Sequence, residues 1–234
     1  MKKIDISPRK ENTRDLIIPD MHITRLDEMY DQFICNINAI KEKFEIADRL
    51  HMSGELKAEK DIYRSQIVFI ESALDYYLHC LGIYATEQMY QSNWDKTDGY
   101  KDLRVPIGKV MFAIMHPENT DWLEETIIAY HASKTYMSPK EIKGQLTFVV
   151  GKGFYKRVAD KMYYDIYSRE NTEDKLTANL QKIFDRRNRV VHQADREHLT
   201  GKEYDVSHEE AELFIGVIEE FVNCIHLLLT QSTE

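Results

Sequence analysis

Residues 61–84 read DIYRSQIVFIESALDYYLHCLGIY, and this stretch decides the expected fold. Apolar side chains recur in it at steps of three and four residues and form one stripe, made of Ile67, Ile70, Leu74, Tyr77, Leu78 and Leu81. This spacing is typical of an amphipathic α-helix. Val68 and Phe69 widen the stripe, so a helix over residues 56–84 is expected to lie at the centre of the protein.

The same helical period continues on both sides of this segment. Glycine and proline are scarce, with 9 and 5 residues in a chain of 234, and β-branched residues seldom alternate with polar ones. The pattern predicts helices over residues 23–50, 105–115, 121–135, 139–149 and 155–167, another from Thr172 into an arginine cluster, and a last one from Ser207. The expected class is therefore an all-α, up-and-down helical bundle.

Helix starts are indicated by residues that cap free backbone amides. Ser138 precedes Pro139 and is followed three residues on by Glu141, which together predict a capped first turn. Asn171 and Thr172 are good N-caps for the helix that enters the arginine cluster, and Ser207 with Glu210 repeats the pattern at the last helix.

Length and composition favour one domain over residues 21–234, preceded by a loose arm over residues 1–20 that contains Pro8 and Pro19. The chain start lacks the apolar run of a secretion signal, and no segment approaches the roughly 20 apolar residues of a membrane span. We therefore expect a cytoplasmic protein without membrane contact. Three widely spaced cysteines within helical patterns predict buried thiols, at Cys35, Cys80 and Cys224.

The net charge of -9 argues against a surface that binds nucleic acid everywhere. Charge near residue 185 has the opposite sign, because one acid, Asp185, stands among four basic residues, Lys182, Arg186, Arg187 and Arg189. A local basic site is therefore compatible with the acidic average.

One arginine of this cluster is expected to face inward. On an ideal helix, Arg187 falls on the apolar stripe that is formed by Leu176, Leu180, Phe184 and Val191. A guanidinium keeps its charge and is costly to bury alone, so Arg187 requires a partner. That partner is either a bound anion or a buried acid, for which Glu71 and Asp75 on the central helix are the candidates.

Asn188 and His192 stand four residues apart and share a flank of the same helix. Arg187 and His192 stand five apart and diverge by about 140° on a regular helix. The two side chains can meet if the helix is distorted near Arg189, or if a second copy of the chain brings the same segment across a two-fold axis.

The segment Arg187-Asn188-Arg189-Val190-Val191-His192 resembles the Arg-x4-His motif of the HEPN superfamily, including the polar residue after the arginine. The apolar pair before the histidine and the long apolar helix that follows are also similar to the stand-alone prokaryotic branches of that family. The resemblance implies a HEPN-type bundle with additional helices inserted before the motif helix, which dimerises around the motif. It implies metal-independent cleavage of single-stranded RNA by a toxin or phage-defence effector, held in check by an antitoxin or other partner protein.

The resemblance also implies roles for the motif residues, without any metal or other cofactor. His192 would take the proton from a ribose 2′-hydroxyl, Arg187 would hold the phosphate, and Asn188 would orient either the phosphate or the histidine. The basic residues Lys182, Arg186 and Arg189 would contact the RNA. Position 194 is Ala194, so the His-x-Tyr extension of toxins paired with nucleotidyltransferase antitoxins is missing.

Two further features leave alternatives open. Glu71 and Ser72 either line this site or face solvent, and solvent is slightly favoured. Asp75 and His79 stand four apart, but no third ligand is evident, so no metal site is predicted and His79, like His131 and His226, is interpreted as a packing or surface residue. The alternative function is a non-catalytic dimeric module that binds a nucleotide, RNA or a protein.

Overall fold

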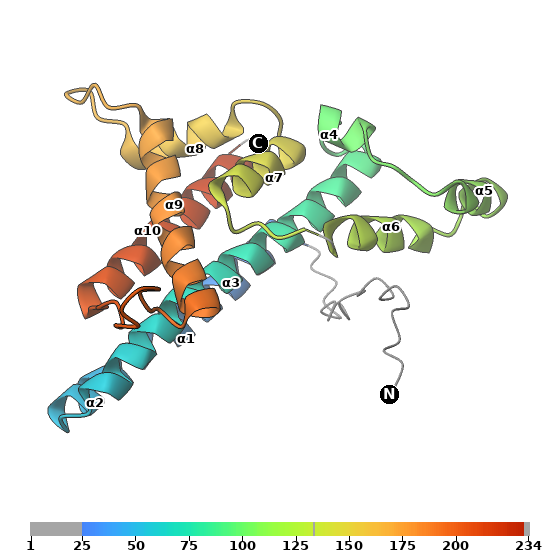
Figure 1. Ribbon diagram of the computed structural model, residues 1–234. Helices are drawn as coiled ribbons and strands as arrows, with labels where there is room; N and C mark the ends of the chain where they lie inside the picture. The colour runs from blue at the N-terminus through green and yellow to red at the C-terminus, as the bar shows by residue number, and fades with distance from the viewer. Residues whose placement is uncertain (1–24, 133, 232–234) are drawn as a thin grey trace, which may run out of the picture.

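The computed structural model describes residues 25–132 and 134–231, and over these residues the chain forms helices and no β-strand. The predicted N-terminal arm lies outside the described residues. The all-α helical bundle is thereby confirmed (Figure 1). The helices are α1 (Leu26–Lys41), α2 (Lys43–Met52), α3 (Leu56–Tyr90), α4 (Asp98–Lys101), α5 (Ile107–Met115), α6 (Asp121–Ala132), α7 (Pro139–Val149), α8 (Phe154–Tyr163), α9 (Thr172–Gln193) and α10 (His208–Thr230).

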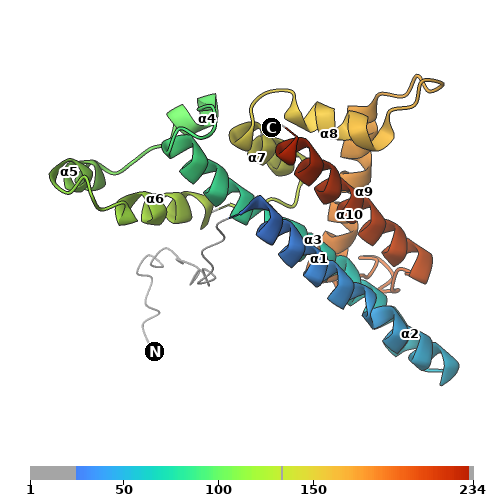
Figure 2. The same ribbon diagram turned by 180° about the vertical axis from the view of Figure 1, so that it is seen from behind.

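The long helix α3 is the centre of the bundle, as predicted. It runs six residues beyond the predicted end, because Ala85 and Met89 continue the buried stripe through two more turns. Helices α1 and α2 pack along one side of α3, and α10 packs against α1, α3 and α8 (Figure 2). The predicted first helix is divided at Glu42 into α1 and α2.

The described part of the segment between α3 and the motif helix forms five helices, of which the short α4 contacts α7 and the other four fall into two groups. α7 and α8 pack on the body, where they contact α3, α9 and α10. α5 and α6 extend away from the body as an arm, joined to it where α6 contacts α3 (Figure 1). The predicted helix starts are confirmed. The Ser138 hydroxyl accepts a hydrogen bond from the Glu141 amide, Asn171 caps α9, and Ser207 caps α10.

The expectation that no segment approaches a membrane span was wrong for α10, which is long and apolar enough to cross a membrane by length and composition alone. Nine of its side chains are buried within the bundle, among them Phe214, Ile218 and Phe221. The buried side of α10 contributes to the core of the bundle, and 44% of its most apolar stretch is buried. We therefore describe α10 as a core helix.

The prediction of buried cysteines is confirmed only in part. Cys224 is buried, Cys80 is half-buried and Cys35 is exposed, and all three are free thiols. Cys35 lies on the outer side of α1, since its neighbours Phe33 and Ile37 occupy the inward positions.

Candidate functional site

The motif lies in the second half of α9, which crosses α3 (Figure 1). The Asn171 side chain accepts hydrogen bonds from the amides of Glu173 and Asp174 and so starts the helix. The helix is unbroken to Gln193 and ends at Ala194 and Asp195, which adopt left-handed conformations with φ of 48° and 53°. This turn sends Asp195 back beneath the helix, where the Asp195 amide donates to the Arg189 carbonyl at 2.9 Å.

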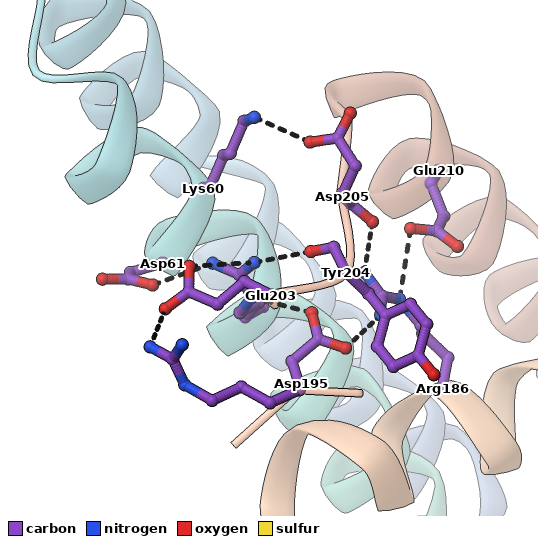
Figure 3. A network of polar contacts seen from close by, with 10 residues as sticks. Lys60, Asp61, Arg186, Asp195, Glu203, Tyr204, Asp205 and Glu210 are labelled. Carbon is purple, nitrogen blue, oxygen red and sulfur yellow. Dashed lines mark hydrogen bonds and ion pairs between the residues drawn. The ribbon is translucent and has the colours of Figure 1, made fainter. Parts of the chain in front are cut away.

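Arg186 is the buried arginine of the cluster, with 2% of its side chain exposed. It donates hydrogen bonds to the Asp195 carboxylate, to the Asp205 carbonyl at 2.7 Å and to the Glu210 carboxylate at 3.3 Å (Figure 3). Each of the three guanidinium nitrogens therefore donates to an acceptor from the protein itself.

A second arginine completes this network. Arg64 on α3 donates to the other Asp195 oxygen and to the Tyr204 carbonyl, each at 2.8 Å. Asp195 is fully buried between Arg64 and Arg186, so its charge is shared by two cations. We call the set Arg64, Arg186, Asp195 and Glu210 the anchor network, because it joins α3, α9, α10 and the loop between the last two helices.

The anchor network overturns one predicted role. Arg186 cannot contact RNA as predicted, because its side chain is buried and its donors are already used by acceptors of the protein. The predicted stripe on α9 also needs correction: Leu176 and Leu180 are buried, but the buried face continues through Ile183 to Arg186, while Phe184 is half-buried and Val191 is 45% exposed. The reason is that the end of α9 packs against the loop that carries Asp195.

Arg187 lies at the crossing with α3, with 17% of its side chain exposed. Its nearest acid is Glu71, whose Oε2 atom is 3.9 Å from the Arg187 Nε atom. Both of these atoms are buried and neither has a hydrogen-bond partner, so the contact is an ion pair at long range without a hydrogen bond. The one hydrogen bond shown for this guanidinium runs from Nη1 to the Asn188 side-chain oxygen at 3.1 Å.

Glu71 itself is 2% exposed, so the prediction that it faces solvent was wrong, although Ser72 beside it is exposed. Burial raises the pKa of the Glu71 carboxyl to about 8, and this effect outweighs the opposing attraction of Arg187. Burial therefore favours the uncharged form of this carboxyl, and no hydrogen bond joins it to Arg187.

Asp75, one turn further along α3, serves another set of contacts. Its carboxylate accepts a hydrogen bond from the Tyr136 amide and lies 3.6 Å from His79. Burial raises the Asp75 pKa as well. Behind this pair His131 is buried and bonded to the Tyr136 hydroxyl at 2.6 Å, and burial lowers its pKa to about 3. Among the described residues no group of three metal-ligating side chains occurs.

His192 is exposed on the last turn of α9. Because the helix is regular throughout the motif, the divergence of about 140° between Arg187 and His192 remains. Distortion near Arg189, one of the two ways in which they could meet, is thereby excluded. Asn188 lies on the same flank as His192, one turn earlier.

The other two residues that were predicted to contact RNA, Lys182 and Arg189, differ in solvent exposure. Lys182 is exposed, with its Nζ atom 5.6 Å from the centre of the Phe214 ring. Arg189 is half-buried and lies over the Tyr204 ring at 4.9 Å, with a buried Nε atom that has no hydrogen-bond partner. The sequence did not predict roles for Arg64 and Asp195. The one signal was the position of Asp195, an acid three residues after His192 that could pair with a buried arginine.

Comparisons of this chain with protein-family models, with curated proteins and with solved structures found no match. The class that the coordinates define is an all-α bundle with an anchored arginine cluster and an exposed histidine at the end of one helix. The resemblance to the HEPN superfamily therefore depends on the motif residues themselves.

Proposed function

We propose that this protein is a metal-independent endoribonuclease of HEPN type that cleaves single-stranded RNA. The observation that carries the proposal is the difference in hydrogen bonding between the neighbouring residues Arg186 and Arg187. Each of the three Arg186 nitrogens donates a hydrogen bond to the protein, whereas the one hydrogen bond shown for Arg187 goes to Asn188 and 17% of the Arg187 side chain is exposed. A guanidinium in this condition is suited to a phosphate, which takes two parallel N–H donors.

The proposed reaction assigns one step to each motif residue. His192, exposed and near the surface of a bound strand, takes the proton from a ribose 2′-hydroxyl. The 2′-oxygen then bonds to the adjacent phosphorus, the bond to the 5′-oxygen breaks, and the protonated His192 returns a proton to that leaving oxygen. Arg187 stabilises the charge on the phosphoryl oxygens. Asn188 orients the Arg187 guanidinium through the hydrogen bond between the two side chains. The products are a 2′,3′-cyclic phosphate and a 5′-hydroxyl end.

The unbroken helix supports a site that is shared by two copies. Since Arg187 and His192 diverge within one chain, we propose that Arg187 of one copy acts with His192 of the other. The exposed side chain of Val191 lies next to His192 and supplies an apolar surface for such a contact. Lys182 and Arg189 remain as the residues that guide the strand.

The test uses single-stranded RNA in EDTA with the wild-type protein, Arg187→Ala and His192→Ala. We expect cleavage by the wild type, loss in both variants, and recovery of about a quarter of the activity when the two variants are mixed and allowed to exchange subunits, since each mixed dimer then has one intact site. Arg196→Ala is the matched control, because this arginine is exposed and outside the motif. A single-stranded DNA of the same sequence should stay intact.

Intact RNA with all three proteins would contradict the nuclease. If the wild type then still retained RNA in a filter-binding assay and Arg187→Ala did not, the binding module would be the better description. We place the activity in the cytoplasm and propose that a partner protein of antitoxin type restrains it.

A further inference from the structure

The helix α5, with sequence IGKVMFAIM, is the most exposed apolar element of the described chain. None of its nine residues is buried, and Ile107 and Ile114 are each 75% exposed, Met115 64% and Met111 56%. Monomeric soluble proteins rarely expose contiguous apolar surface on this scale. A helix this short is also marginal in water without tertiary contacts. Its apolar face therefore requires a cover.

The position of α5 shows that, among the described residues, the body of the bundle does not provide this cover. Both views place α5 at the far end of the arm, away from α9 and α10 (Figures 1 and 2). Its main helix contact is with α6, and Lys109 on α5 is tied to Glu125 on α6 at 2.9 Å. The ion pair fixes one side of α5 to α6 and leaves the apolar side facing outward.

The two flanks of α5 carry opposite charge. On the N-terminal side Lys101 and Arg104 are exposed, with Asp102 between them. On the C-terminal side Glu118 and Asp121 are exposed, and α6 continues with further acids. A helix with a basic flank at one end and an acidic flank at the other is complementary to an antiparallel copy of itself.

We propose that the apolar face of α5 binds the same face of a second copy of this chain in antiparallel orientation. Ile107, Met111 and Ile114 fall on one stripe at steps of four and three residues, which is the spacing of a helix-to-helix contact. An axis near Met111 places Arg104 of one copy beside Glu118 of the other. The methionines suit such a contact, because their flexible side chains fill irregular gaps.

The same charges disfavour a membrane as the occupant. Helices that lie on bilayers carry many lysines or arginines on their polar face, whereas α5 carries Lys109 alone and is followed by the acids of α6. The inference does not depend on the proposed nuclease, since it is drawn from the arm and not from the motif.

The test is cross-linking of the full-length chain by a short bismaleimide. The exposed Cys35 is first replaced by serine, and Met111→Cys is introduced in that background. We expect Met111→Cys to yield a covalent dimer and Leu213→Cys, an exposed position on α10, to yield at least tenfold less. Adding Ile114→Glu should reduce the Met111→Cys product at least tenfold while the helical content stays unchanged. Absence of the product, or its persistence with Ile114→Glu, would overturn the proposal.

Charge reversal tests the antiparallel register. Arg104→Glu and Glu118→Arg should each lower the yield of cross-linked Met111→Cys, and the double variant should restore it. Yields that fall further in the double variant would overturn the register. Co-sedimentation with phosphatidylglycerol vesicles that is lost in Ile114→Glu, without any cross-linked dimer, would show that a lipid surface and not a second copy covers α5.

Discussion

Arg186 and Arg187 are neighbours in the sequence, yet they lie in two regions of opposite character. Arg186 enters the anchor network, where Asp195, Glu210 and a carbonyl occupy its donors. Arg187 points toward α3, where Glu71 lies 3.9 Å away without a hydrogen bond. A buried cation with complete partners stabilises the fold, whereas one with incomplete partners retains the capacity to bind an anion.

The largest effect is expected from breaking the anchor network. Arg186→Met leaves the buried Asp195 with one cation and removes the link to α10. We expect a loss of about 3–5 kcal/mol in the free energy of unfolding, the usual cost of removing one partner from a buried ion pair. Urea denaturation followed by circular dichroism measures it. A loss below about 1 kcal/mol would mean that the network contributes little to stability.

A smaller effect, on activity and not on folding, is expected at the neighbouring position. Arg187→Ala should lower the rate of RNA cleavage by about 100- to 1,000-fold, as the loss of a donor to a developing charge does elsewhere. Its free energy of unfolding should change by less than about 1 kcal/mol, since no hydrogen bond to Glu71 is lost. Arg187→Lys should recover little activity, because a lysine lacks the paired donors of a guanidinium. Full activity in Arg187→Ala would contradict the proposed role.

Glu71→Gln tests the contact between Arg187 and Glu71 through the pH dependence of stability. Because the pKa of Glu71 is raised from 4.5 to about 8, the folded state binds more protons than the unfolded state between these values. Stability should therefore be fully present below pH 4.5 and fall as pH rises toward 8, by up to about 1.4 kcal/mol per pH unit. Glu71→Gln should remove most of the decrease in unfolding free energy with pH. A smaller decrease should remain, because the pKa of Asp75 is raised as well. An unchanged slope in thermal melts from pH 5 to pH 8.5 would show that Glu71 is charged when folded.

The smallest effect is expected at the rim of the anchor network. Arg196 pairs with Glu203 and is 47% exposed. Solvent screens such a pair, so Arg196→Met should cost less than about 1 kcal/mol. The difference between this variant and Arg186→Met, measured under identical conditions, isolates the contribution of burial. A cost equal to that of Arg186→Met would show that the loop, and not the buried charges, holds the end of α9.

Comparison of these arginines also shows where prediction from sequence ends. On an ideal helix Arg187 lies closer to the Leu176 and Leu180 stripe than Arg186 does, so Arg187 was predicted as the inward residue. The structure buries Arg186 more deeply, because Asp195 and Glu210 approach from a loop and a helix that follow in the chain. The spacing of apolar residues predicts which side of α9 is buried, but it does not predict where Asp195 and Glu210 lie relative to that helix.

Elements with local causes can be predicted from the sequence. The stripe from Ile67 to Leu81 and the caps at Ser138, Asn171 and Ser207 act within a few residues of one another, so their spacing is enough to predict α3 and the starts of α7, α9 and α10. Long-range packing determines which arginine is paired with buried acceptors and that α5 lies at the end of an arm. Both outcomes depend on residues that are distant in the chain, and the free energy of burying a charge or an apolar face is set by what lies opposite it.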